Sequence, residues 1–300
     1  MNMKVDLCGV TLNNPVMTAS GTFGSGAEYA EFVDLNKLGA VVTKGVANVP
    51  WPGNPTPRVA EVYGGMLNAV GLQNPGIDLF VERDIPFLKQ FDTKIMVNVC
   101  GHSTEEYIEV VERLRDQPVD LLEINISCPN VKEGGIAFGQ DPKAVEAITK
   151  EMKKHAAQPV IMKLSPNVTD ITEMARAAEA GGADGLSLIN TITGMKIDIN
   201  RQKFVLANKT GGMSGPAIHP VAVRMVYQTA QAVRLPIVGM GGIMNAEDAI
   251  EMILAGATAV SVGTANFTNP HVTEEIVAGI RDYMERYQVA DIRDLVGAVH

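Results

Sequence analysis

Residues 121–130 read LLEINISCPN. The segment begins as an apolar run over 121–126, with Glu123 and Asn125 as its polar interruptions. Pro129 has no backbone N–H to donate to a sheet, so the strand must end before it. Cys128 is therefore predicted just beyond the carboxyl end of a core strand, which in α/β folds is the end where ligands bind.

Short apolar runs and helical segments alternate along the whole chain. The predicted strands are 15–19, 40–43, 95–97, 121–126, 160–162, 185–189, 236–238 and 259–262. The predicted helices are 28–38, 77–91, 105–114, 142–155, a helix capped by Thr169 or Asp170 that stops at Gly181, then 219–233, 246–255, 272–287 and 292–299. Eight such alternations predict an α/β fold, a (β/α)8 TIM barrel, as a single domain over residues 1–300.

A doubly wound open sheet is the alternative, and it is disfavoured because the alternation continues to eight strands and then stops. Residues 4–12 are predicted to form a small hairpin outside the main sheet. Residues 46–75 and 192–216 are predicted as long βα-loop insertions. The prolines and glycines of 46–75 argue against a regular helix or central strand there. Loops this long are more often functional than idle.

Composition excludes several classes of function. The chain has 300 residues, 46% of them apolar, and a net charge of −9, which argues against nucleic-acid and acidic-membrane partners. No apolar run is long enough to cross a bilayer. Three cysteines, far apart in sequence, disfavour a disulfide framework and favour a reducing cytoplasm. No Cys/His spacing resembles a zinc site.

Polar side chains stand at or directly after several predicted strands. They share an amide, amine or hydroxyl group, and they are Lys44, Asn98, Asn125, Lys163, Asn190 and Thr191. Strand ends of a parallel barrel converge on one face, so these residues are predicted to line a pocket. Each one alone could equally be an ordinary turn residue.

The last two predicted strands end in glycines instead. Residues 239–242 read GMGG, and Gly263 precedes Thr264, with Gly215 as a further candidate. Loops after strands seven and eight of a barrel often hold a phosphate on backbone N–H groups. A phosphate cradle beside two lysines suggests FMN or pyridoxal phosphate. The second would need a Schiff-base lysine and leaves Cys128 without a role.

Cys128 has three possible roles on the sequence alone. It can be a buried apolar residue, a nucleophile, or a general base in proton abstraction. An ordinary thiol with a pKa of about 8.5 is only slightly ionised at neutral pH, so a cysteine base predicts activity that rises with pH. Cys8 and Cys100 are interpreted as inert.

Several motifs together resemble class 1 dihydroorotate dehydrogenases. They are NISCPN, MLNAVGLQNPG, GNPTPR, KLSPNVTD, INT, GGMSGPA, GMGGI and VGTA, and the resemblance covers residues 20–264 in order. It implies an FMN-containing barrel that oxidises dihydroorotate to orotate in pyrimidine (UMP) synthesis. It also implies that Cys128 is the base that removes the C5 proton while a hydride passes from C6 to FMN.

The resemblance assigns site residues one by one. The substrate-binding residues it implies are Lys44, Asn68, Ala69, Val70, Gly71, Leu72, Asn125, Asn130, Asn190 and Thr191. The FMN-binding residues it implies are Ser20, Lys44, Gly45, Asn98, Asn125, Lys163, Ile189, Gly215, Gly241, Gly242, Gly263 and Thr264. The Gly-rich segment 130–139 is interpreted as a lid that excludes water.

Within class 1 the motifs look more like class 1B. That class implies a partner subunit carrying FAD and a [2Fe–2S] cluster, electrons passed to NAD⁺, and a heterotetramer on a dimer core. Alternatives are a class 1A enzyme that uses fumarate, another FMN barrel acting on a pyrimidine ring, a non-catalytic flavin- or phosphate-binding barrel, and a Schiff-base barrel lyase using Lys44 or Lys163.

Overall fold

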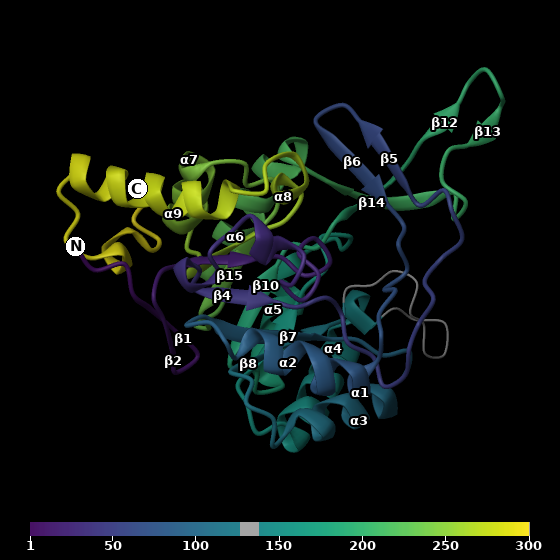
Figure 1. Cartoon of the computed structure of the whole chain (residues 1–300), viewed down its shortest axis with the longest axis horizontal. Helices are drawn as coiled ribbons and strands as arrows, with labels where there is room; N and C mark the ends of the chain where they lie inside the picture. The colour runs from purple at the N-terminus through teal and green to yellow at the C-terminus, as the bar shows by residue number, and fades with distance from the viewer. Residues whose placement is uncertain (127–137, 300) are drawn as a thin grey trace.

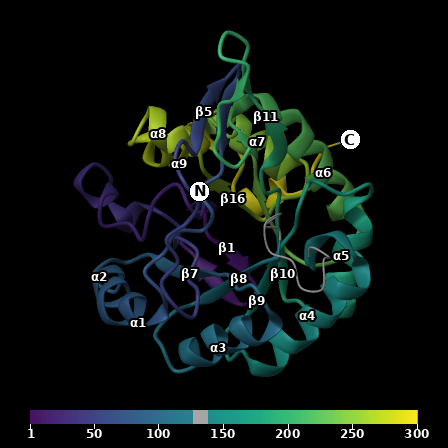
Figure 2. The ribbon, with the colours of Figure 1, turned by 90° about the vertical axis from the view of Figure 1, so that its right-hand side faces the viewer.

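The computed structural model describes residues 1–126 and 138–299. Within them, eight parallel strands close into a barrel in the order β10-β15-β16-β3-β4-β7-β8-β9 (Figures 1 and 2). The strands are β3 (Val16–Thr18), β4 (Ala40–Val42), β7 (Lys94–Val99), β8 (Leu121–Asn125), β9 (Val160–Lys163), β10 (Gly185–Leu188), β15 (Ile237–Met240) and β16 (Ala259–Val262). The predicted (β/α)8 barrel is confirmed.

Helices surround the barrel (Figure 2). They are α1 (Ile77–Leu79), a π-helical turn (Phe80–Asp84), α2 (Ile85–Leu88), α3 (Thr104–Leu114), α4 (Pro142–His155), α5 (Ile171–Ala180), α6 (His219–Ala232), α7 (Ala246–Leu254), α8 (Ala265–Thr268) and α9 (Val272–Arg286). Side-chain caps explain where two of them begin. Asp141 accepts a hydrogen bond from the Lys143 N–H, and Asp170, one of the two predicted caps, accepts from the Thr172 N–H.

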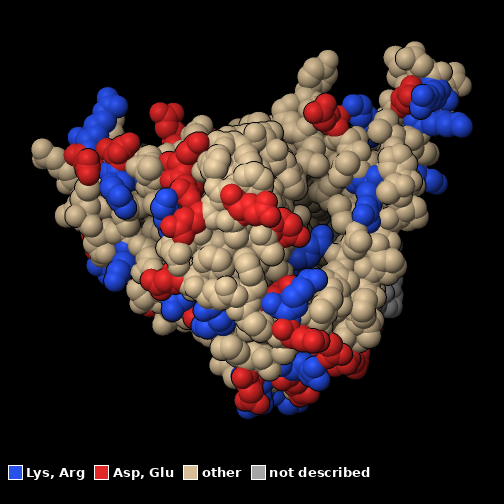
Figure 3. All heavy atoms as spheres, viewed as in Figure 1, with Lys and Arg blue, Asp and Glu red and all other residues tan. Residues whose placement is uncertain are grey.

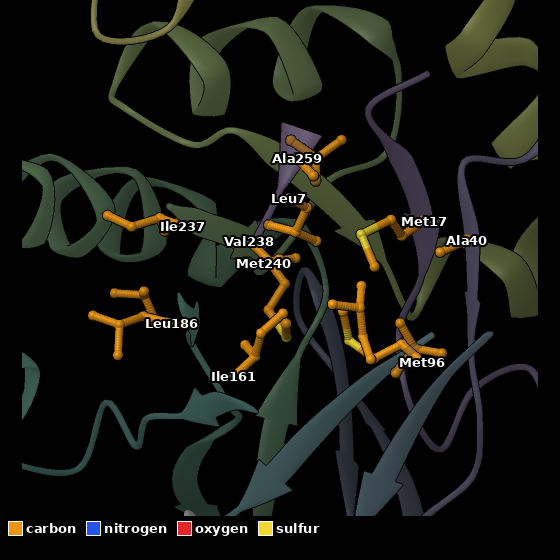
Figure 4. Packing of buried hydrophobic residues seen from close by; sticks show 14 of the residues in the cluster. Leu7, Met17, Ala40, Met96, Ile161, Leu186, Ile237, Val238, Met240 and Ala259 are labelled. Atoms are coloured by element: carbon orange, nitrogen blue, oxygen red, sulfur yellow. The ribbon is translucent and has the colours of Figure 1, made fainter. Parts of the chain in front are cut away.

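The hairpin predicted at the N-terminus is confirmed. β1 (Val5–Leu7) and β2 (Val10–Leu12) pair antiparallel, and Leu7 and Leu12 are fully buried. Figure 4 shows Leu7 among barrel residues such as Met17 and Val238. The hairpin turn brings Cys8 against Gly185, the first residue of β10, so the hairpin packs on the end of the barrel where strands begin.

Two predicted helices are wrong. Residues 28–38 form only two 3-10 turns, Tyr29–Glu31 and Leu35–Lys37, because Asp34 is extended and caps the second turn by accepting from the Asn36 N–H. The helical conformation is therefore interrupted at a point where the apolar spacing predicted one continuous helix. Residues 292–299 contain one 3-10 turn, Ile292–Leu295, again begun by an aspartate cap, Asp291.

The two long insertions are more ordered than predicted. They contain β5 (Val59–Val62), β6 (Gly65–Asn68), β11 (Ile192–Met195) and β14 (Thr210–Ser214), which form an antiparallel sheet in the order β11-β14-β6-β5. We call this the cap sheet. A further pair, β12 (Ile197–Asp198) and β13 (Lys203–Phe204), projects beyond it at the upper right of Figure 1. No proline lies between Pro57 and Pro75, so β5 and β6 form in a stretch from which proline does not exclude strands.

Close backbone approach holds the cap sheet together at Gly65. A Cβ atom there would lie 1.9 Å from the Ser214 carbonyl oxygen, which belongs to β14 and cannot rotate away. We expect Gly65→Ala to destabilise the protein by about 1–3 kcal/mol, as overpacking does. The measurement is the midpoint of urea unfolding.

Gly194→Ala in the same sheet is the matched control. Its Cβ would meet only the end of the Leu67 side chain, at 3.1 Å, so little loss of stability is expected. Equal losses in both variants would contradict the role assigned to the Gly65–Ser214 contact.

Candidate active site

A cavity of about 370 Å³ opens where the barrel strands end and the cap sheet begins. Its volume suits a small-molecule site. Val59, Met66, Thr193 and Thr210 of the cap sheet form one wall, and residues at the strand ends form the floor. Figure 3 shows a hollow between the barrel and the projecting strands.

Most residues predicted for the site line this cavity. They are Ser20, Lys44, Gly45, Asn68, Ala69, Val70, Gly71, Leu72, Asn98, Asn125, Lys163, Ile189, Asn190, Thr191, Gly241, Gly242, Gly263 and Thr264. Gly215 is not among the lining residues; it packs against Gly65, where a Cβ would meet the Gly65 Cα at 2.6 Å. Cys128, Asn130 and most of the predicted lid lie outside the described residues.

Lys44 is a partly buried cation near the end of β4. Burial lowers the pKa of its ammonium group, and the positive charge of Arg58 lowers that pKa further. A lysine that is desolvated in this way gains strongly from an anionic ligand. The site therefore suits a ligand that carries a carboxylate or phosphate.

Below the cavity floor lies a buried polar cluster that sequence reasoning missed. Its centre is the Glu123 carboxylate, which is 1% exposed and accepts hydrogen bonds from Asn98 Nδ2 at 2.5 Å and Ser187 Oγ at 2.7 Å. Lys163 Nζ lies 3.5 Å from the same carboxylate and donates to Ser20 Oγ at 3.1 Å. Glu123 had looked like a mere interruption of an apolar run.

The glycines at the ends of β15 and β16 have different structural roles. Gly241 and Gly242 have positive φ values of 129° and 71°, and a Cβ at either would collide with α6, so packing on that helix requires them. At Gly263 a Cβ would make only ordinary contacts, the nearest 3.4 Å away, and would point at no protein obstacle. Because Gly263 lines the cavity, its lack of a side chain fits a closely approaching ligand.

This glycine cradle fits a phosphate-bearing cofactor such as FMN. Thr264, beside Gly263, hydrogen-bonds through Oγ1 to Ser214 Oγ at 2.7 Å, which ties the cradle to the cap sheet. This corner offers backbone N–H groups and two hydroxyls, and none of the described residues that line the cavity carries a carboxylate, so it suits an anion. The adjoining amides of Asn98, Asn125 and Asn190 can bind a planar heterocycle on its polar edges.

Sequence reasoning also missed several residues that line the cavity. They come from the loop after β3, from the cap sheet and the segments that flank it, from β15 and β16, and from the segments that follow these two strands: Ala19, Gly21, Thr22, Val59, Met66, Thr193, Asn208, Thr210, Gly211, Gly212, Ser214, Ile218, Met240, Ile243, Met244, Ser261 and Phe267. The GGMSG motif over 211–215 was the one available signal for the cap-sheet wall.

Two other features of the described residues bear on the class of protein. None of their helices is both long and apolar enough to span a membrane. They also bring no three His, Cys, Asp or Glu side chains together as a metal site.

A closed parallel barrel with a polar cavity at the carboxyl ends of its strands defines a (β/α)8-barrel enzyme. Comparison with known proteins gives the family. The dihydroorotate dehydrogenase family model matches residues 2–284, so the chain belongs to the dihydroorotate dehydrogenase family.

Relatives from several bacteria are similar over their full length. A protein of Lachnoclostridium phytofermentans is 72% identical over 299 residues, covering 100% of both chains, and one of Alkaliphilus metalliredigens is 65% identical, covering 100% of this chain and 99% of its own. Both are named dihydroorotate dehydrogenase B (NAD(+)), catalytic subunit. A solved structure of Eimeria tenella DHODH with ferulenol superposes with a TM-score of 0.82, covering 99% of this chain and 88% of that one; at 22% identity it supports the fold alone.

Proposed function

We propose that this chain is the catalytic subunit of an NAD⁺-linked dihydroorotate dehydrogenase, which oxidises dihydroorotate to orotate in pyrimidine synthesis. The observation that carries the proposal is full-length identity of 72% to a relative of that name. The cavity supports it, because most of the residues assigned by resemblance to substrate and FMN line it.

FMN is the cofactor that the site fits. Gly241, Gly242, Gly263 and Thr264 would hold its phosphate, while Lys163, Ser20 and Asn98 would lie against its ring system. When bound there, FMN would supply the hydride-accepting chemistry that oxidation at C6 of dihydroorotate requires. The chain supplies binding and orientation around that step.

The substrate would be held by amides and one cation. Lys44 balances the carboxylate of dihydroorotate, and Asn68, Asn125 and Asn190 offer donors and acceptors to the ring edges. Cys128 removes the proton at C5, and Asn130 contributes to the same site. Both residues are assigned by the motif NISCPN.

A partner subunit completes the pathway of electrons. The words "catalytic subunit" in the relatives' names support a separate partner. We infer that this partner carries FAD and a [2Fe–2S] cluster, passes electrons to NAD⁺, and forms a heterotetramer on a dimer of this chain in the cytoplasm. We also infer one domain over residues 1–300, since one large buried cluster includes residues from Met3 to Leu295 and the second cluster has only three buried members.

The test is anaerobic stopped-flow mixing of the purified chain with dihydroorotate. We expect the oxidised flavin absorbance to bleach rapidly, and orotate but not uracil to perturb the flavin spectrum. Addition of NAD⁺ with the partner, compared with fumarate alone, then identifies the acceptor. A chain that binds no flavin, or whose flavin dihydroorotate cannot reduce, would sink the proposal.

The lowered pKa of Lys44 predicts how orotate binding depends on pH. Orotate carries a carboxylate, so it binds better to protonated Lys44. Its affinity should be constant while free Lys44 is protonated and should fall as pH rises through a pKa below the ordinary 10.5 of lysine. The measurement is the dissociation constant of orotate from flavin absorbance across pH.

Lys44→Met provides the control. It should bind orotate more weakly at neutral pH and lose the alkaline decline. If the decline persists unchanged in Lys44→Met, another group is responsible.

A further inference from the structure

Glu123 is the buried charge that the proposed mechanism does not use. It lies in β8 and is absent from the cavity lining, whereas Asn98, Asn125 and Lys163 line it. Its carboxylate contacts three strands at once, through Asn98 of β7, Lys163 of β9 and Ser187 of β10. Glu123 therefore lies directly beneath the residues that would contact the flavin and the substrate.

Stability does not account for this carboxylate. A buried ion pair recovers its desolvation cost only in part, and apolar residues of similar volume are often at least as stabilising. Leu121, which points to the same face of β8 as Glu123, is apolar and fully buried, so this face accommodates such a residue. The role of the charge is therefore to be sought in what it does to its three partners.

The first effect concerns the orientation of two amides. A carboxylate only accepts hydrogen bonds, so the Asn98 nitrogen must face Glu123 and its oxygen must face the other way. That oxygen accepts from Asn125 Nδ2 at 3.4 Å, which in turn leaves the Asn125 oxygen on the side away from Asn98. One buried anion thus sets the donor and acceptor directions of two cavity-lining amides.

The second effect concerns the charge of Lys163. The Lys163 side chain is 5% exposed, and its ammonium group lies between Ser20 Oγ and the Glu123 carboxylate. The separation of 3.5 Å from Glu123 places a compensating negative charge below the lysine while its head remains at the cavity surface. In a buried setting such a charge changes the local potential strongly.

We propose that Glu123 is a positioning residue that sets the hydrogen-bonding polarity of Asn98 and Asn125 and moderates the positive charge that Lys163 presents to the flavin. This inference rests on the proposed function, because it concerns the same cavity. It assigns a role to a residue that never touches the ligands itself.

The test compares Glu123→Gln with Glu82→Gln. Both remove one negative charge at nearly constant volume, but Glu82 is exposed on the π-helical turn. We expect Glu123→Gln to raise the midpoint potential of the bound flavin, because loss of the anion favours the electron-rich reduced form. We expect the dissociation constant of FMN to rise roughly tenfold, as for lost hydrogen bonds to a charged group. Glu82→Gln should change neither.

Two further variants separate charge from geometry. Ser187→Ala keeps the Glu123 carboxylate and should leave the midpoint potential of the bound flavin at the wild-type value. Glu123→Asp keeps the charge but withdraws it from Asn98, so orotate affinity should fall roughly tenfold while the potential stays nearly constant. This variant also keeps the inference testable if Glu123→Gln does not fold.

The outcomes are distinguishable from failure of the proposed function. Wild-type protein without flavin, or with flavin that dihydroorotate cannot reduce, contradicts the proposed function before any variant is made. Wild-type protein that is reduced normally, combined with an unshifted potential and FMN affinity in Glu123→Gln, overturns the role of Glu123 alone. Wild-type orotate affinity in Glu123→Asp overturns the orienting part.

Discussion

Cys128→Ala is expected to slow flavin reduction by dihydroorotate about 10²–10⁴-fold at neutral pH, the usual contribution of a general base. Without a base, the C5 proton must leave to water or hydroxide, so the residual rate should rise with pH. Orotate should still bind, because the amides and Lys44 remain. Stopped-flow absorbance of the flavin gives the rate, and an orotate titration gives the affinity.

Cys8→Ala is the matched control for this experiment. Cys8 lies in the β1–β2 turn, at the end of the barrel away from the cavity, and burial together with the charges of Asp184 and Asp6 raises the pKa of its thiol to about 12. It stays protonated at any working pH, and its removal should leave the reduction rate unchanged. A rate in Cys128→Ala equal to that in Cys8→Ala would refute a base at position 128.

Lys163→Met is expected to destabilise the protein by about 3–5 kcal/mol, because it leaves the Glu123 carboxylate buried without its cation. The two side chains are 5% and 1% exposed, so the carboxylate would lose its cation in a largely buried setting. Adding Glu123→Gln to the same chain should recover most of the loss, since the double variant buries no unpaired charge. Urea unfolding of the single and double variants measures both changes.

The exposed pair Lys150–Glu146 on α4 serves as the comparison. Lys150→Met should cost less than about 1 kcal/mol, the usual range for a surface pair. Two results would contradict a stabilising buried ion pair between Lys163 and Glu123. One is a loss of stability in Lys163→Met no larger than that in Lys150→Met, and the other is a double variant as unstable as Lys163→Met alone.

The barrel and much of its cavity were predictable because they depend on local signals. Strand positions follow from short apolar runs, and a parallel barrel collects their carboxyl ends on one face. Polar residues at those ends, such as Lys44, Asn98 and Lys163, could therefore be assigned to one pocket before any coordinates. The role of Cys128 depends on motif likeness, and the structure does not describe that residue.

The cap sheet could not be predicted because its pairing is long-range. β6 pairs with β14 through contacts such as Leu67 with Met213, and no local periodicity in either segment indicates the other. Glycine and proline suggested irregular loops, yet Gly65 is required because β6 and β14 approach so closely there. The helix predicted over 28–38 does not form, and here the cause is local. The Asp34 cap interrupts the helix despite a favourable apolar spacing.

The sequence by itself determined the fold, the family and the chemical character of the cavity, because strand periodicity, strand-end residue types and motifs are local properties. Only the tertiary structure shows that the cap sheet forms one wall of the cavity and that the Glu123 cluster lies beneath its floor. Glu123 looks unremarkable in LLEINISCPN, and its partners lie 25, 40 and 64 residues away. Only the side-by-side pairing of β7, β8, β9 and β10 brings them within hydrogen-bonding distance. Burial then makes one carboxylate able to orient the site above it.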